Sequence, residues 1–101
     1  MNATIVGASG YSGRELVSLL VNHPEVTLSQ VTSRALAGQS VHSEIPNVRG
    51  KVKDLCFSNP SIRELTEQSE CELFFLALPH GTAASYAIPL LESGKKVIDL
   101  S

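Results

Sequence analysis

The amino-acid sequence predicts an α/β domain with a doubly wound, mainly parallel sheet, and three observations lead to this fold class. Strand-like and helix-like segments alternate along the chain. Two of the strand-like segments, Thr4 to Gly7 and Leu73 to Leu78, are continuous apolar runs of the kind that parallel sheets bury on both faces. A loop with three evenly spaced glycines connects the first strand to the first helix. The expected order of the strands is 3-2-1-4-5.

The composition is that of a single globular domain of 101 residues, of which 43% are hydrophobic and 18% are charged. The net charge of −2 argues against binding to the phosphates of nucleic acid. No run approaches the roughly 20 apolar residues of a membrane span, and no basic segment with a cleavage site precedes the first strand. Cys56 and Cys71 lack the spacing of a metal site, so we expect reduced structural thiols and no metal. We therefore expect a cytoplasmic protein without a membrane or nucleic-acid partner.

The glycine loop is followed by a helix and a second strand. The helix is predicted from about Ser12 to Asn22, where it ends because Pro24 disfavours helix in the residue before it. The leucines expected on one side of this helix are Leu16, Leu19 and Leu20. Val26 to Thr32 alternates apolar and polar residues, which predicts the second strand.

The next stretch is less regular. Ser33 to Lys51 shows no clear period and is long for a loop in a compact domain, so we expect it to be functional or partly disordered. Lys51 to Phe57 is predicted as a weak strand. A helix is predicted near Ser61 to Ser69, where Ser61 and Glu64 have the spacing of a capping box.

The last part of the chain repeats the order strand, helix, strand. A helix is predicted from Thr82 to Glu92, with Gly94 in the left-handed position that ends it. Pro89 removes a backbone donor inside this helix, which predicts a kink or a split helix. The side chains expected on one side of it are Ala84, Ala87 and Leu91. The final strand is Lys96 to Leu100, and because nothing follows it where a binding crevice is expected, we interpret the chain as the first domain of a longer protein.

Gly7, Gly10 and Gly13 stand between a strand and a helix, which is the context that a dinucleotide-binding fingerprint requires. Gly7 can form the tight turn, Gly10 leaves room for a diphosphate to approach the backbone, and Gly13 lets the helix pack close to the strand. The helix amides and the positive end of the helix dipole then favour an anion. The alternative is that the glycines serve backbone shape only. The alternation of strands and helices favours the first interpretation and a Rossmann-like fold.

The end of the second strand indicates which dinucleotide binds. Recognition of NAD uses an acidic residue about 20 positions after the glycines, which bonds the ribose 2′-hydroxyl. No carboxylate occurs from Val26 to Gln39, and Ser33 and Arg34 stand there instead. A guanidinium suits the additional 2′-phosphate of NADP. We therefore expect NADP as the cofactor; the alternative is that Arg34 is a solvated loop residue.

A second loop with chemical groups, Ala77 to Thr82, leaves the carboxyl end of the fourth strand, beside the place where ligands bind in such sheets. We expect Leu78, Pro79 and His80 to lie near the nicotinamide half of the cofactor. A lone histidine at a loop–helix junction is more often a packing or capping residue than a base. His80 is therefore interpreted as a cofactor neighbour, and no residue of the chain is assigned a catalytic role.

Four segments carry a resemblance to a known family, and they are residues 7–16 (Gly-Ala-Ser-Gly-Tyr-Ser-Gly-Arg-Glu-Leu), 32–34 (Thr-Ser-Arg), 77–81 (Ala-Leu-Pro-His-Gly) and 96–101 (Lys-Val-Ile-Asp-Leu-Ser). With these segments in this order, the sequence resembles the N-terminal part of N-acetyl-γ-glutamyl-phosphate reductase, an NADP-dependent semialdehyde dehydrogenase of arginine biosynthesis. The Tyr-Ser pair after the second glycine is more similar to this reductase than to aspartate-semialdehyde dehydrogenase. The expected cofactor-binding residues are Gly7, Ser9, Gly10, Tyr11, Ser12, Gly13, Ser33, Arg34, Leu78, Pro79 and His80.

The resemblance also implies a reaction. In this family a cysteine thiolate attacks an acyl phosphate, NADPH reduces the resulting thioester, and a histidine assists proton transfer. These groups belong to a second, catalytic domain, so we expect residues 1–101 to be a truncated cofactor domain that is inactive alone. The full-length protein is expected to act on a small acyl phosphate as a homo-oligomer. Two alternatives stay open: the cofactor domain of aspartate-semialdehyde dehydrogenase, and a non-catalytic NADP-sensing module.

Overall fold

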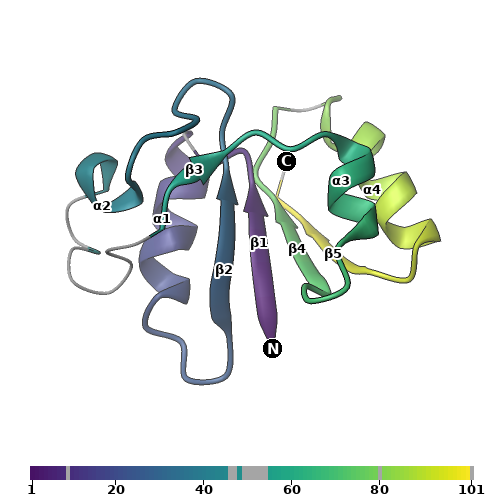
Figure 1. Cartoon of the computed structure of the whole chain (residues 1–101), viewed down its shortest axis with the longest axis horizontal. Coiled ribbons are helices and arrows are strands. Elements are labelled where there is room, and N and C mark those ends of the chain that lie inside the picture. The colour runs from purple at the N-terminus through teal and green to yellow at the C-terminus, as the bar shows by residue number, and fades with distance from the viewer. Residues whose placement is uncertain (9, 46–47, 49–54, 80, 101) are drawn as a thin grey trace.

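The computed structural model of the chain describes residues 1–8, 10–45, 48, 55–79 and 81–100. Its centre is a five-stranded sheet in the order β3-β2-β1-β4-β5, in which every strand pair is parallel (Figure 1). The strands are β1 (Asn2–Val6), β2 (Thr27–Thr32), β3 (Phe57–Ser58), β4 (Leu73–Leu76) and β5 (Lys96–Asp99). The fold class and the strand order predicted from the sequence are confirmed.

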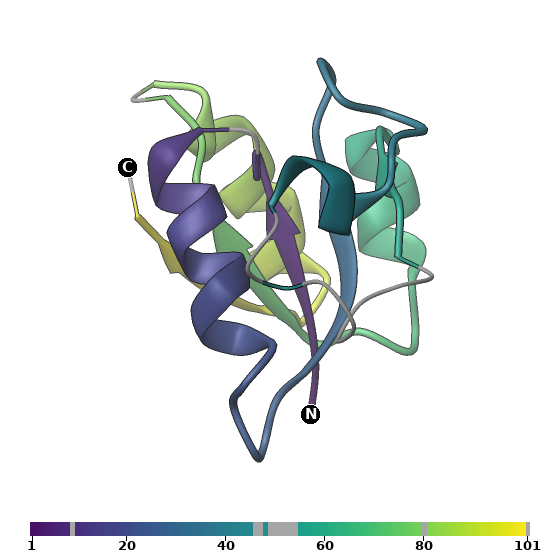
Figure 2. The same ribbon diagram turned by 90° about the vertical axis from the view of Figure 1, so that its left-hand side faces the viewer.

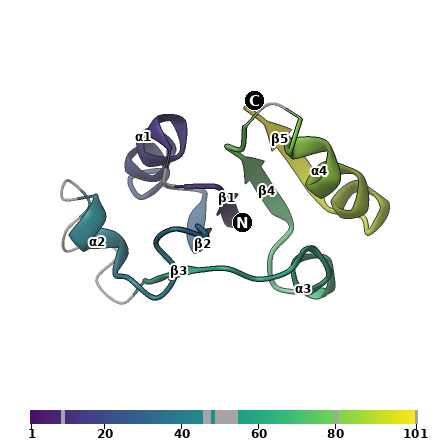
Figure 3. The ribbon, with the colours of Figure 1, turned by 90° about the horizontal axis from the view of Figure 1, so that it is seen from above.

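Helices cover both faces of the sheet. α1 (Tyr11–Leu20) and α2 (Val41–Glu44) pack on one face, in front of the strands in Figure 2. α3 (Ile62–Glu67) and α4 (Ala83–Glu92) pack on the other, as the view from above shows (Figure 3). Because side chains alternate along a strand, neighbouring residues enter different cores. Ile5 belongs to the core under α1, whereas Val6 belongs to the core under α3 and α4.

The strand boundaries differ from the predicted ones by a few residues. β1 begins at Asn2 rather than Thr4, because Asn2 and Ala3 already pair with Thr27 and Leu28 of β2. β3 is limited to Phe57 and Ser58 within the described residues, and most of the predicted strand, residues 51–54, lies outside them.

The predicted buried side of α1 is wrong in one position. Leu19 is 67% exposed, whereas Gly13, Val17 and Leu20 are buried. The cause is the close approach at Gly13, where an added Cβ atom would lie 2.5 Å from the Ala8 Cα. This contact turns the helix so that positions four and seven residues after Gly13 face the sheet.

Of the two outcomes predicted for Pro89, a kink or a split helix, the split does not occur, because α4 is continuous from Ala83 to Glu92. The carbonyl of Ser85 loses its backbone partner to Pro89 and lies on an exposed residue, where water can bond it. Leu91 is 57% exposed, and the buried side chains of the helix are Ala83 and Leu90. The predicted ending is confirmed, since Gly94 has φ +86° and its N–H donates to Leu91.

The irregular segment after β2 contains structure that the sequence did not predict. α2 is a single short helix, and Val41, Ile45 and Val48 are buried in the core under α1. The Val41 N–H donates to the Leu55 carbonyl, which joins α2 to the residues just before β3. The described part of this segment, residues 33–45 and 48, is thus packed against the sheet.

Candidate functional site

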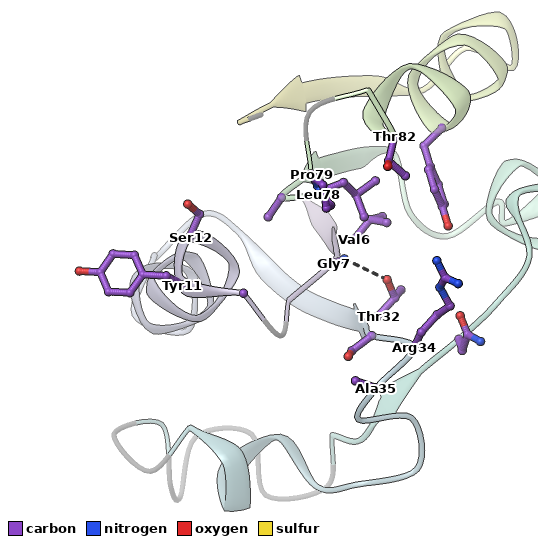
Figure 4. A pocket seen from close by; sticks show the side chains of 15 residues that line it. Val6, Gly7, Tyr11, Ser12, Thr32, Arg34, Ala35, Leu78, Pro79 and Thr82 are labelled. Atoms are coloured by element: carbon purple, nitrogen blue, oxygen red, sulfur yellow. Dashed lines mark hydrogen bonds between the residues drawn. The ribbon is translucent and has the colours of Figure 1, made fainter.

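A groove of about 520 Å³ runs across the carboxyl ends of the parallel strands (Figure 4). It lies between the start of α1, the ends of β1, β2 and β4, and the start of α4. Its lining residues are Val6, Gly7, Gly10, Tyr11, Ser12, Thr32, Ser33, Arg34, Ala35, Asn59, Ala77, Leu78, Pro79, Thr82 and Tyr86. This is the edge at which open α/β sheets bind their ligands.

The glycine loop is fixed to the end of β2 by the backbone of Thr32. The N–H groups of Gly7 and Ala8 both donate to the Thr32 carbonyl, over 3.2 and 2.9 Å, and the Gly7 N–H also lies 3.3 Å from the Thr32 hydroxyl. These two amides are therefore occupied within the chain. Any ligand on this loop has to use the amides at the beginning of α1 instead.

The beginning of α1 offers such amides. Its first helical hydrogen bond runs from the Arg14 N–H to the Gly10 carbonyl, over 3.0 Å. The N-cap residue Gly10 provides no side-chain cap, and the first turn carries no acidic side chain. The N–H groups of the first turn have no partner within a helix, and the helix dipole makes this end electropositive. The start of α1 is thus an open site for an anion.

The structure explains each of the three glycines differently. Gly7 has φ +86°, and a Cβ atom there would lie 2.8 Å from the Ala77 carbonyl oxygen. At Gly13 a Cβ atom would collide with the backbone of Ala8, as described above. Gly10 has an ordinary φ of −78°, and a Cβ atom there would meet no heavy atom within 4 Å. Nothing in the described chain requires a glycine at position 10, so the open space beside it is left for a ligand.

Ser33 and Arg34 follow directly after β2. Ser33 is only 3% exposed, and its hydroxyl accepts a hydrogen bond from the Leu36 N–H over 3.1 Å, which fixes the turn that carries Arg34. The Arg34 side chain is exposed and extends across the groove toward the side of α4, where Thr82 is labelled in Figure 4. Among the described residues it makes no ion pair and no side-chain hydrogen bond. Its charge is therefore available to an anionic ligand.

The other expected site residues are distributed as follows. Leu78 and Pro79 line the groove at the end of β4, and Ser12 lies at the start of α1. Tyr11 also borders the groove, but its ring points away from Arg34 and is 81% exposed. Ser9 and His80 lie outside the described residues.

Several groove residues were not singled out from the sequence. Thr32 stands next to the predicted Ser33 and belongs to segment 32–34, which carries the family resemblance. That segment could have indicated Thr32 as a groove residue. Asn59 follows β3, and Tyr86 lies on α4 between apolar residues, where it has the pattern of an ordinary core residue. No local signal distinguishes these two, because the fold alone brings them to the groove.

The described ranges could also contain a metal site, a membrane-spanning helix or reactive cysteines. They contain no group of three or more His, Cys, Asp and Glu side chains arranged to hold a metal ion. None of the helices in these ranges has the length and apolar character that a bilayer crossing requires. Both cysteines are free thiols, and the buried Cys71 lies 3.0 Å from the Thr4 hydroxyl.

Comparison with known proteins identifies close relatives in sequence. The chain is 50% identical over 101 residues to N-acetyl-γ-glutamyl-phosphate reductase of Methanosarcina mazei, which covers all of this chain and 29% of that protein. It is 50% identical over 97 residues to the reductase of the same name in Desulfotalea psychrophila, covering 96% of this chain and 27% of that protein. The chain thus spans less than a third of the length of these relatives.

Solved structures show the same fold. Aspartate semialdehyde dehydrogenase with NADP from Candida albicans has a TM-score of 0.76 at 23% identity, over 97% of this chain and 28% of that one. GenD2 from gentamicin A biosynthesis, in complex with NAD, has a TM-score of 0.72 at 19% identity, over 98% of this chain and 26% of that one. The family model described as "Semialdehyde dehydrogenase, NAD binding domain" matches residues 2–101. The chain therefore belongs to the family of NAD-binding domains of semialdehyde dehydrogenases.

Proposed function

We propose that residues 1–101 form a domain that binds NADP(H) in the groove. The diphosphate contacts the first-turn amides of α1 beside Gly10, and the 2′-phosphate contacts the Arg34 guanidinium. Leu78 and Pro79 border the nicotinamide half. The single observation that carries this proposal is the uncapped start of α1, which faces open space at a glycine that the chain itself does not require.

The preference for NADP over NAD rests on charge. The Arg34 guanidinium is not paired with any described carboxylate, and the described residues of the groove lining include no acidic side chain that could accept a ribose 2′-hydroxyl. A guanidinium without a described acidic neighbour favours a ligand with an additional phosphate.

For the complete protein we propose reduction of N-acetyl-glutamyl phosphate to N-acetyl-glutamate semialdehyde, a step of arginine biosynthesis. The sequence relatives that bear the name of this reductase support the assignment. The bound cofactor would supply the hydride, while this domain would hold and orient it against a substrate carried by a second domain. We further propose that the complete enzyme is a cytoplasmic homo-oligomer.

The binding proposal is tested by calorimetric titration of the chain with NADPH and with NADH. We expect a one-to-one complex with NADPH and binding to NADH that is weaker by about tenfold or more. Absence of binding to both nucleotides would contradict the proposal, and equal affinity would contradict the role of Arg34.

The proposed reaction is tested on the complete protein. Assays with N-acetyl-glutamyl phosphate and with aspartyl phosphate should show turnover of the first substrate only. Turnover of aspartyl phosphate alone would instead favour aspartate-semialdehyde dehydrogenase, and turnover of neither would favour a sensing module.

A further inference from the structure

Tyr86 is an aromatic residue of the groove that the proposed function does not yet use. It lies in the middle of α4 and is half-buried. Its side chain packs against the core formed by Val6, Leu65 and the residues of β4, and it also lines the groove. Its hydroxyl makes no side-chain hydrogen bond with any described residue. Tyr86 therefore presents part of a fixed ring to the groove.

Covalent structure limits where the adenine base of NADP can lie. The base is attached to C1′ of the ribose, next to the C2′ atom that carries the additional phosphate. With that phosphate on the Arg34 guanidinium, the base has to lie beside Arg34, at the end of the groove away from Leu78. Arg34 extends toward the α4 side of the groove (Figure 4). The base is thereby directed toward the wall to which Tyr86 belongs.

The aromatic ring of Tyr86 makes this residue the favoured contact for the adenine base. Two of the described groove residues carry aromatic rings, Tyr11 and Tyr86, and the ring of Tyr11 points away and is 81% exposed. A flat purine stacks well on an aromatic ring, and a guanidinium plane can cover the other face of the base. We propose that Tyr86 stacks on the adenine base of the dinucleotide and acts as a positioning residue for the adenosine half. This inference rests on the proposed function.

The packing of Tyr86 against the core lowers the entropic cost of its contact with the base. A side chain that is already held by the core loses little conformational freedom when a ligand arrives. The same packing also gives Tyr86 a structural role in α4. Therefore the test has to separate loss of the stacking plane from loss of folding stability.

The experiment compares three variants of the chain by calorimetry with NADPH and with adenosine 2′,5′-bisphosphate. Tyr86→Phe keeps the ring, Tyr86→Leu removes it, and Leu91→Ala is the control at an exposed residue of the same helix that does not line the groove. We expect Tyr86→Leu to weaken both ligands about tenfold, because both contain adenine. Tyr86→Phe and Leu91→Ala should stay within about twofold of the wild type.

A second measurement does not depend on any variant. In the wild-type chain, adenosine 2′,5′-bisphosphate should move the NMR signals of the Tyr86 ring protons upfield, through the ring current of adenine, and leave those of Tyr11 nearly unchanged. The inference is overturned if these signals stay in place, if Tyr86→Leu binds like the wild type, or if Tyr86→Phe loses as much affinity as Tyr86→Leu. A wild-type chain that binds no NADPH would instead overturn the proposed function.

Discussion

At the scale of single residues, one glycine motif serves three separate purposes. Gly7 is required by its positive φ and by the Ala77 carbonyl, and Gly13 is required by the contact with Ala8. Gly10 has neither constraint. The spacing of the three glycines is visible in the sequence, but this division of roles depends on atoms that only the fold brings close.

This division predicts that alanine destabilises the fold to different extents at the three positions. Gly7→Ala and Gly13→Ala should each lower the free energy of unfolding by about 1–3 kcal/mol or more, because their Cβ atoms would meet backbone atoms. Gly10→Ala should lower it by less than about 1 kcal/mol, since alanine is only a poorer N-cap. Urea denaturation measures all three.

The same Gly10→Ala variant should bind NADPH at least about tenfold more weakly, because its methyl group takes the space of the diphosphate. Calorimetry on the folded variant gives the affinity. Unchanged affinity would remove the diphosphate from the start of α1.

Arg34 carries the second prediction at this scale. Arg34→Ala should weaken NADPH binding by about 1.5–3 kcal/mol, or ten- to a hundredfold, and leave NADH binding nearly unchanged. The reason is that the guanidinium would contact the additional phosphate, and no described carboxylate of the chain pairs with it. Arg63→Ala, which removes an exposed arginine paired with Glu67 on α3, is a suitable control. An equal loss for both nucleotides would contradict the assignment of Arg34.

At the scale of elements, the start of α3 shows how a short helix is fixed. The predicted capping box is confirmed: the Glu64 N–H donates to the Ser61 hydroxyl over 3.1 Å, and the Ser61 N–H donates to the Glu64 carboxylate over 2.9 Å. The hydrogen bond from the Ser61 backbone, followed by the one with its side chain, lowers the pKa of Glu64 from its usual value. The carboxylate therefore supports α3 only while it is ionised.

The pH dependence of this contribution follows from the sign of the shift. Because the pKa of Glu64 is lower in the folded chain, the unfolded chain binds more protons at acid pH, and stability falls as the pH drops through the folded pKa. Ser61→Ala should cost about 1 kcal/mol of stability through the lost N-cap. It should raise the pKa of Glu64 only part of the way back to its usual value, because the backbone N–H of residue 61 still donates to the carboxylate. An NMR titration of the Glu64 carboxyl group checks this, and an unchanged pKa in the variant would refute the role of the Ser61 hydroxyl.

How far the elements could be predicted from the sequence depends on what defines them. The apolar runs, Pro24, Gly94 and the capping box are local signals, and the corresponding elements lie within a few residues of their predicted positions. The buried side of α1 was only partly predictable from leucine spacing, because the contact of Gly13 with Ala8 sets the rotation of this helix. α2 has only four residues, too few to show a period.

At the scale of the whole molecule, the groove exists because the ends of β1, β2 and β4 and the starts of α1 and α4 meet at one edge of the sheet. The glycine loop, Arg34 and Leu78 could be predicted from that topology, since each directly follows a strand. Asn59 and Tyr86 could not, because they come from segments 25 and 52 residues after Arg34 and carry no motif. Thus the residues that directly follow a strand are predictable from the sequence, whereas Asn59 and Tyr86 reach the groove only through the tertiary fold.

A ligand that spans this edge should stabilise the chain as one unit. NADPH at a hundred times its dissociation constant should add about 2.7 kcal/mol to the free energy of unfolding. For a domain of this size, about 4–8 °C per kcal/mol converts this gain into a rise of about 10–20 °C in the melting temperature. Calorimetric melting with increasing NADPH measures the rise, and NADH at the same concentration should produce a smaller one because Arg34 has no phosphate to contact. Should the melting temperature be unaffected by NADPH, the groove would not be a dinucleotide site, whereas equal rises with both nucleotides would leave the site in place and remove its selectivity.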